Sequence, residues 1–229
     1  SNFGETFEDN SIIPLIIENT ISLQNEDYDE LLSFKIKDVV KTGLSLYNKY
    51  IWGIGSNNKY YEIWNIEDKK KIHHARESKK ITNIDIASEQ NYVLGFENGD
   101  IKIFHYGKQY IIQAHDDLIN KVLISNDGQR IITSSLDKKI KFWNIDGVLL
   151  VTLMFIDDEW LVTAPNGQFD KSENFNGLHW VQNNYIIDFE QMLDDFYTPG
   201  LLSQVYQAGE LDKTRNLDKA LKQAIPTIE

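Results

Sequence analysis

The chain repeats one kind of strand ending at a nearly constant spacing. Three strand-like segments end in the aromatic residues Trp64, Phe104 and Trp143, which lie 40 and 39 residues apart. A turn residue stands six positions before each aromatic: Asn58, Asn98 and Asp137. Such a period is typical of arrays in which one supersecondary unit recurs and neighbouring units stack to bury a continuous core. The sequence therefore predicts several similar units in a row.

Residues 114–145 are the clearest of these units. His115 opens the segment, and two alternating apolar runs follow on either side of the turn at 126–128, which reads Asn-Asp-Gly. Asp137 then precedes a third run that ends at Trp143. Alternation with a period of two predicts half-buried strands, and Asn, Asp and Gly favour tight turns between them.

This order and spacing resemble a WD40 repeat, in which four antiparallel strands form one blade. The resemblance implies an all-β fold, a WD40-type β-propeller. It also implies a structural tetrad of His115, Ser135, Asp137 and Trp143, in which a buried His bridges the turn Asp and a strand hydroxyl that bonds the indole. Pairing makes the burial of these polar groups tolerable. Thr133 lies on the same strand face as Ser135 and is the alternative hydroxyl.

The same Ser, His and Asp side chains could also suggest a catalytic triad. A structural role accounts for the spacing and for the Trp, and a triad requires neither. We therefore predict no catalytic residues. The adjacent His73 and His74 with Glu77 are not predicted to bind a metal, because neighbouring strand residues point to opposite faces. One of these histidines is predicted to be the counterpart of His115 in an earlier unit.

Further blades are predicted on both sides of the three repeats. Residues 11–36 hold three short apolar stretches, and residues 148–183 hold four strand-like pieces that would form another blade. The sequence thus predicts about five blade-equivalents within residues 1–183, as a partial or small propeller. Unpaired strand edges would promote pairing with other chains. The propeller is therefore expected to close as a small ring, to need blades outside this chain, or to self-associate through its terminal blades.

From Asp188 the pattern changes from a period of two to one of 3.6. Four apolar residues then recur at helical spacing: Phe189, Met192, Leu193 and Phe196. Thr198-Pro199 is predicted to begin a second helix, because Pro is tolerated in a first turn. Asn216 is predicted to begin a third. Residues 184–229 are therefore predicted to form a helical C-terminal extension.

Residues 157–181 and 189–210 resemble the end of certain bacterial WD40-repeat proteins, in which a caspase-like peptidase domain often lies elsewhere in the same chain. The matching residues include Glu159, Trp160, Pro165, Gly167, Phe169 and Asp170. The sequence departs from that pattern at Ala164, Asn166 and Thr198. The resemblance implies a partner-binding or sensing module beside an effector. It does not imply peptidase activity for this chain, since the chain has no Cys to act as nucleophile.

Charge and composition restrict the partners. The formal net charge is −12, so general binding to nucleic acid is not expected. No stretch is apolar enough to span a membrane, and the first residues do not resemble a signal peptide. The lack of Cys fits a reducing compartment, and a cytoplasmic location is expected. No cofactor is predicted, because no Gly-rich phosphate loop is present.

Together these features predict a non-catalytic protein-protein interaction or sensing module of a larger bacterial WD40 protein, which would regulate or scaffold an effector. The partner would be a protein whose identity the sequence does not give. The alternative is a hydrolase or small-ligand-binding propeller that uses carboxylates near the central channel. An enzyme should show a concave pocket where several Asp or Glu side chains and an aromatic converge, whereas a scaffold should show a flat face with exposed aromatics.

Overall fold

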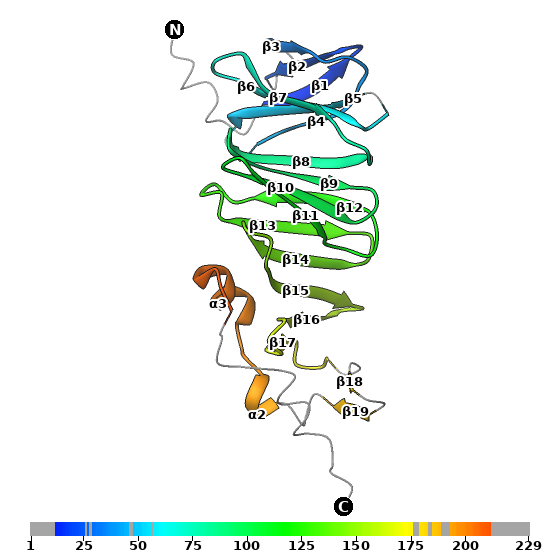
Figure 1. The fold of residues 1–229 in the computed structure, drawn as a ribbon, viewed down its shortest axis with the longest axis vertical. Coiled ribbons are helices and arrows are strands. Elements are labelled where there is room, and N and C mark those ends of the chain that lie inside the picture. The colour runs from blue at the N-terminus through cyan, green and yellow to red at the C-terminus, as the bar shows by residue number, and fades with distance from the viewer. Residues whose placement is uncertain are drawn as a thin grey trace, which may run out of the picture. The chain divides into compact units, whose positions relative to one another are not determined.

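The computed structural model describes residues 12–25, 27, 29–45, 48–55, 57–175, 179–182, 185–188 and 193–211. It divides into two compact units, residues 1–137 and residues 138–229. This division falls inside the segment predicted as propeller blades, and the predicted boundary at 183/184 stays a prediction. Figure 1 shows the strands and helices of both units.

The first unit is built from antiparallel sheets whose strands follow one another in sequence order. The first sheet contains β1 (Ile13–Ile17), β2 (Thr20–Gln24) and β3 (Glu30–Lys35). The second contains β4 (Val39–Leu44), β5 (Tyr50–Gly55), β6 (Tyr60–Asn65) and β7 (Lys70–Arg76). The third contains β8 (Ile81–Ser88), β9 (Asn91–Phe96), β10 (Asp100–His105) and β11 (Lys108–Gln113). The antiparallel pair β12 (Ile119–Ile124) and β13 (Arg130–Ser135) ends the unit.

Local sequence explains these strands and their turns. In β13, residues alternate strictly between half-buried and buried, as the period of two predicted. The turn before it closes through the Gly128 N–H, which donates to the Ser125 carbonyl oxygen at 2.7 Å. Gly128 has φ +66°, a conformation that a residue without a Cβ adopts at little cost.

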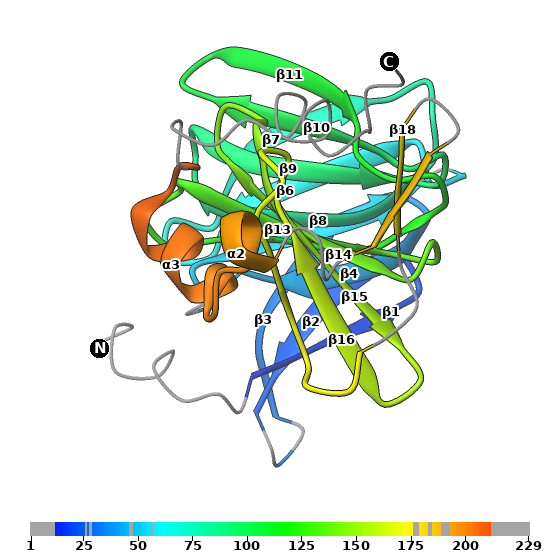
Figure 2. The same ribbon diagram turned by 90° about the horizontal axis from the view of Figure 1, so that it is seen from below.

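Neighbouring sheets of this unit pack face to face, as the two views in Figures 1 and 2 show. One buried cluster joins the first and second sheets and includes Ile21, Phe34 and Ile51. Another joins the second and third sheets and includes Trp52 and Tyr61. Stacked units with a shared core are the arrangement that the repeat period predicted.

The strands β4, β8 and β12 each begin a sheet, and each carries a β-bulge at the same place. The pairing shifts between Val39 and Lys41 in β4, between Ile81 and Asn83 in β8, and between Ile119 and Lys121 in β12. The extra residues are Val40, Thr82 and Asn120. A bulge bends its strand and redirects a side chain, so the repeat places three redirected residues at equivalent positions.

Side chains also connect β8 to β12. The Asn83 Oδ1 atom accepts the Val122 N–H at 3.0 Å, and the Asp85 Oδ2 atom accepts the Ile124 N–H at 2.8 Å. Both acceptors are buried. These bonds satisfy backbone donors of β12 that face a neighbouring sheet, where no strand ladder is available.

The second unit is a four-stranded antiparallel arrangement followed by short elements. It contains β14 (Lys139–Asn144), β15 (Leu149–Ile156), β16 (Glu159–Thr163) and β17 (Phe169–Lys171), paired in that order. β15 to β17 thus extend the sheet of β14, and do not start the separate four-stranded blade predicted at 148–183. β18 (His179–Gln182) and β19 (Tyr185–Asp188) pair only with each other among the described strands.

Two short helices, α2 (Leu193–Phe196) and α3 (Leu201–Ala208), follow in this unit. Leu201 and Val205 on one face of α3 pack into a cluster with Leu150 and Val162. The apolar face of α3 therefore covers the sheet, as an amphipathic helix is expected to do. Phe189 and Met192 of the predicted stripe, and the predicted helix from Asn216, lie outside the described residues. No helix in the described part of the chain is long and apolar enough to cross a membrane.

Candidate functional site

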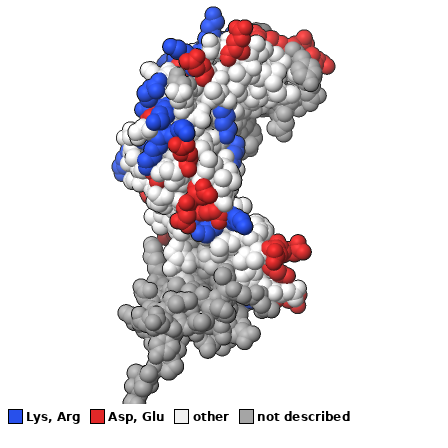
Figure 3. All heavy atoms as spheres, turned by 90° about the vertical axis from the view of Figure 1, so that its right-hand side faces the viewer, with Lys and Arg blue, Asp and Glu red and all other residues white. Residues whose placement is uncertain are grey.

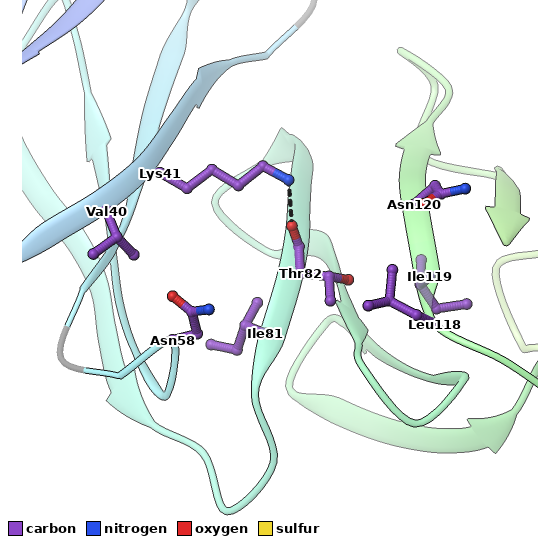
Figure 4. Close-up of a pocket in the computed structure, with 8 residues that line it drawn as sticks. All are labelled: Val40, Lys41, Asn58, Ile81, Thr82, Leu118, Ile119 and Asn120. Atoms are coloured by element: carbon purple, nitrogen blue, oxygen red, sulfur yellow. Dashed lines mark hydrogen bonds between the residues drawn. The ribbon is translucent and has the colours of Figure 1, made fainter. Parts of the chain in front are cut away.

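A pocket of about 380 Å³ opens where β4, β8 and β12 meet in the first unit. Eight residues line it, as Figure 4 shows: Val40, Lys41, Asn58, Ile81, Thr82, Leu118, Ile119 and Asn120. All three bulge residues are among them, so the repeated bulges build this site. Two of the lining residues, Ile81 and Ile119, are buried and give it an apolar base.

Lys41 is the cation of the pocket. Its side chain reaches from β4 to β8, where the ammonium group donates to the Thr82 carbonyl oxygen at 2.6 Å (Figure 4). Burial and the nearby Lys121 ammonium group lower the pKa of Lys41 below its ordinary value of 10.5. Lys121 also interacts with the Asp85 carboxyl group. An opposite charge placed beside Lys41 would relieve the repulsion between the two lysines.

The polar groups around Lys41 come from two other segments. Asn58 lies in the turn between β5 and β6, and its carbonyl oxygen accepts the Ile81 N–H at 2.6 Å. This bond fixes the turn at the beginning of β8. In the described part of the chain, the Thr82 hydroxyl is the one fully buried side-chain oxygen or nitrogen that has no hydrogen-bond partner. Such a group carries a free-energy cost until a partner is supplied.

A second polar cluster surrounds His115. The His115 Nδ1 atom lies 2.9 Å from the Asp137 carboxylate, and its Nε2 atom lies 2.8 Å from the Thr133 hydroxyl. Because an ionised carboxylate only accepts, the Nδ1 atom carries a proton in this arrangement. The imidazole is fully buried. The backbone N–H of His115 donates to the Gly99 carbonyl oxygen at 3.0 Å.

The hydroxyl that meets His115 therefore belongs to Thr133, and Ser135, predicted in this role, bonds elsewhere. The Ser135 hydroxyl donates to the Asp117 carbonyl oxygen at 2.9 Å and accepts the Asp137 N–H at 3.1 Å. Strand geometry places both hydroxyls on one face, so the pattern alone did not separate them. Trp143 lies in the second unit, and its place in the network stays a prediction.

The earlier repeat replaces this cluster with ion pairs. Glu77 and Lys79 follow β7 just as His115 follows β11. Lys79 pairs with Asp100, and Glu77 pairs with Lys102 at 2.8 Å. His73 and His74, of which one is predicted as the counterpart of His115, instead lie within β7. The loop between two sheets is thus tied to the following sheet in both repeats, by different chemistry.

The carboxylates expected of an enzyme do not gather at the pocket. None of its eight lining residues is Asp, Glu or aromatic. In the described residues, no group of three or more His, Asp or Glu side chains could hold a metal ion. On the face drawn in Figure 3, Lys and Arg alternate with Asp and Glu over the described surface, so the net charge forms no broad acidic area there.

Sequence reasoning missed Lys41, Asn58 and Thr82 as site residues. Asn58 had been noted as a turn residue of the repeat, which was the available signal. Lys41 and Thr82 carry no motif. They become neighbours only because bulged strands of adjacent sheets meet, and a bulge is not visible in the alternation of apolar residues.

Comparison with known proteins agrees with this architecture. Residues 107–144 match the WD40 family, described as WD domain, G-beta repeat. The U3 small nucleolar RNA-associated protein 12 of Saccharomyces cerevisiae is 29% identical over 93 residues, which cover 39% of this chain and 10% of that protein. The Protein SUPPRESSOR OF PHYA-105 1 of Arabidopsis thaliana is 22% identical over 98 residues, which cover 40% of this chain and 9% of that protein.

The chain thus spans about a tenth of the length of these two relatives. The family match and the antiparallel sheets together define an all-β, WD40 propeller-like fold, and they support a WD40-repeat protein. Proteins with this repeat are generally non-enzymatic, and the repeat implies a role in protein–protein interaction.

Proposed function

We propose that this chain is a non-catalytic protein-interaction module that binds a segment of a partner protein at the pocket between β4, β8 and β12. The observation that carries the proposal is that the bulges of three successive repeats converge on one pocket. Its apolar base and polar rim are the composition expected of a recognition site. The exposed Val40 side chain, 57% accessible, offers an apolar contact beside Lys41.

A pocket-filling substitution tests this function. The immobilised full chain should capture a partner protein from a lysate of the organism that makes it. Val40→Trp should reduce recovery of that partner at least ~10-fold, since a loss of ~1.4 kcal/mol of binding free energy is sufficient. Ile111→Trp is the matched control, because Ile111 on β11 is 69% exposed and does not line the pocket. Equal recovery by wild type and Val40→Trp would refute the proposal.

We further propose that the module acts beside an effector in a larger protein, as its regulatory or scaffolding part. The resemblance of residues 157–210 to the C-terminal part of bacterial WD40-repeat proteins supports this role. The expected cytoplasmic location remains a prediction.

Self-association through a terminal sheet is a second proposed contact. In the described residues, β1 pairs with β2 alone, whereas the next two sheets have four strands each. The apolar residues of β1, Ile13, Ile16 and Ile17, are 41%, 38% and 52% exposed. An edge strand with exposed apolar side chains promotes association with another chain.

Light scattering across a dilution series of the full chain measures this association. A dimer that resists dilution is expected, and Ile16→Lys should convert it to a monomer because a charge on an edge strand opposes pairing. A wild-type chain that remains monomeric at every concentration would contradict this contact.

A further inference from the structure

Resting on the proposed function, the geometry points to the chemistry of the partner: we propose that the pocket binds the carboxylate of an Asp or Glu side chain, with Lys41 as its ion-pairing residue. The chain has 12 more acidic than basic residues, yet none of the eight residues of this pocket is acidic. The site is therefore a locally positive point in a negatively charged protein.

The ammonium group of Lys41 can bind a partner carboxylate while it keeps its hydrogen bond to Thr82. An ammonium group has three hydrogens, and one of them is engaged by the Thr82 carbonyl oxygen at 2.6 Å. That bond draws the side chain across the pocket from β4 to β8 and fixes the ammonium group at its wall (Figure 4). The two remaining hydrogens can bind a carboxylate without breaking the bond to Thr82. Charge-assisted bonds of this kind are about twice as strong as neutral ones.

The surrounding groups favour an anion over a neutral or cationic occupant. Lys121 adds a second positive charge near Lys41, and the two ammonium groups repel each other. Asn58 supplies an exposed amide, a hydrogen-bond donor that lines the same pocket. The Thr82 hydroxyl, without a partner in the described residues, is a further donor, and a rotation about χ1 would redirect it.

The size of the pocket agrees with a side chain as its occupant. A volume of about 380 Å³ lies at the lower end of the range for small-ligand sites, roughly 300–1,000 Å³. The buried Ile81 and Ile119 beneath it can contact the methylene groups of Glu, while the exposed Val40 contacts the neighbouring residues of the partner. A partner segment that presents an acidic side chain beside apolar residues fits these walls.

Peptides selected from a random displayed library against the full chain are the probe for this inference. Peptides enriched on the wild type should share an Asp or Glu. Its replacement by Asn or Gln should weaken binding at least ~10-fold, equivalent to ~1.4 kcal/mol. Lys41→Gln should weaken binding to a similar degree, and Lys41→Arg should retain most of it. Lys108→Gln removes the same charge from β11 and should change little, and thermal melts of each variant report folding.

The outcomes separate the two proposals. In one outcome, the enriched peptides compete with one another and no longer bind the Val40→Trp variant, yet they bind wild type and Lys41→Gln equally. This outcome would overturn the carboxylate proposal and leave the interaction site intact. Peptides unaffected by both substitutions would overturn the site itself, as would no enrichment. Displacement by inorganic phosphate at the concentration of the peptide would identify a general anion site and would also contradict recognition of an acidic side chain.

Discussion

Replacing His115 by alanine should lower the free energy of unfolding by about 3 kcal/mol, because the change removes one hydrogen-bond partner from each of two buried groups. Asp137 would lose its bond to Nδ1, and the Thr133 hydroxyl would lose its bond to Nε2. The Asp137 carboxylate contributes the larger part, since a lost hydrogen bond costs a buried charged group more than a neutral hydroxyl. Denaturant titration of wild type and variant measures the difference.

Two controls make this result specific to the network. His74→Ala removes an exposed histidine of β7 and should stay within about 0.5 kcal/mol of the wild type. Thr133→Val should destabilise the protein more than Ser135→Ala does, because Thr133 meets the imidazole and Ser135 meets the backbone. A His115→Ala variant as stable as His74→Ala would show that the cluster does not hold the loop before β12.

Replacing Asp85 by asparagine should stabilise the protein at neutral pH and leave it unchanged in acid. Burial raises the pKa of Asp85 from its ordinary 3.8 to about 6, despite the favourable bond from the Ile124 N–H. Because the pKa is raised in the folded state, Asp85 contributes its full stabilisation of the fold below pH 3.8. This stabilisation is lost as the pH rises through about 6. The loss amounts to about 3 kcal/mol.

Asparagine keeps a carbonyl oxygen for the Ile124 N–H but does not ionise. The difference in unfolding free energy between Asp85→Asn and wild type should therefore grow by about 2.4 kcal/mol between pH 4 and pH 8, the remainder of the loss falling below pH 4. Asp68→Asn, at an exposed turn position, is the control and should follow the wild type throughout. Parallel stability curves for wild type and Asp85→Asn would show that Asp85 does not titrate in this range.

The repeat period predicted the stacked antiparallel sheets and located one strand in each of three successive repeats. The aromatic spacing located β6, β10 and β14, and the turn before Arg130 located the pair β12 and β13. These features are local, because alternation and turn residues act within a few positions. His115 and Asp137 were likewise brought together by the resemblance, at a separation fixed by the repeat.

What the sequence did not predict depends on contacts between segments far apart. The choice of Thr133 over Ser135 is decided by the approach of the loop that carries His115 to one strand face. The extension of the β14 sheet by β15 to β17 depends on pairing partners, which apolar runs at 148–183 do not specify. The pocket requires three bulges in separate repeats to face one another, so Lys41 and Thr82 gave no signal of their own.

Hydrogen–deuterium exchange of the full chain with and without its captured partner is the most direct test of the interaction site. Binding at the pocket should slow exchange at residues 39–42, 81–83 and 118–121, the three bulges and the segment before β12, with smaller changes on β11. Slower exchange at these three segments together is the predicted result, because all three line the pocket. Protection confined to β11 or to the second unit, with the bulges unchanged, would contradict the account.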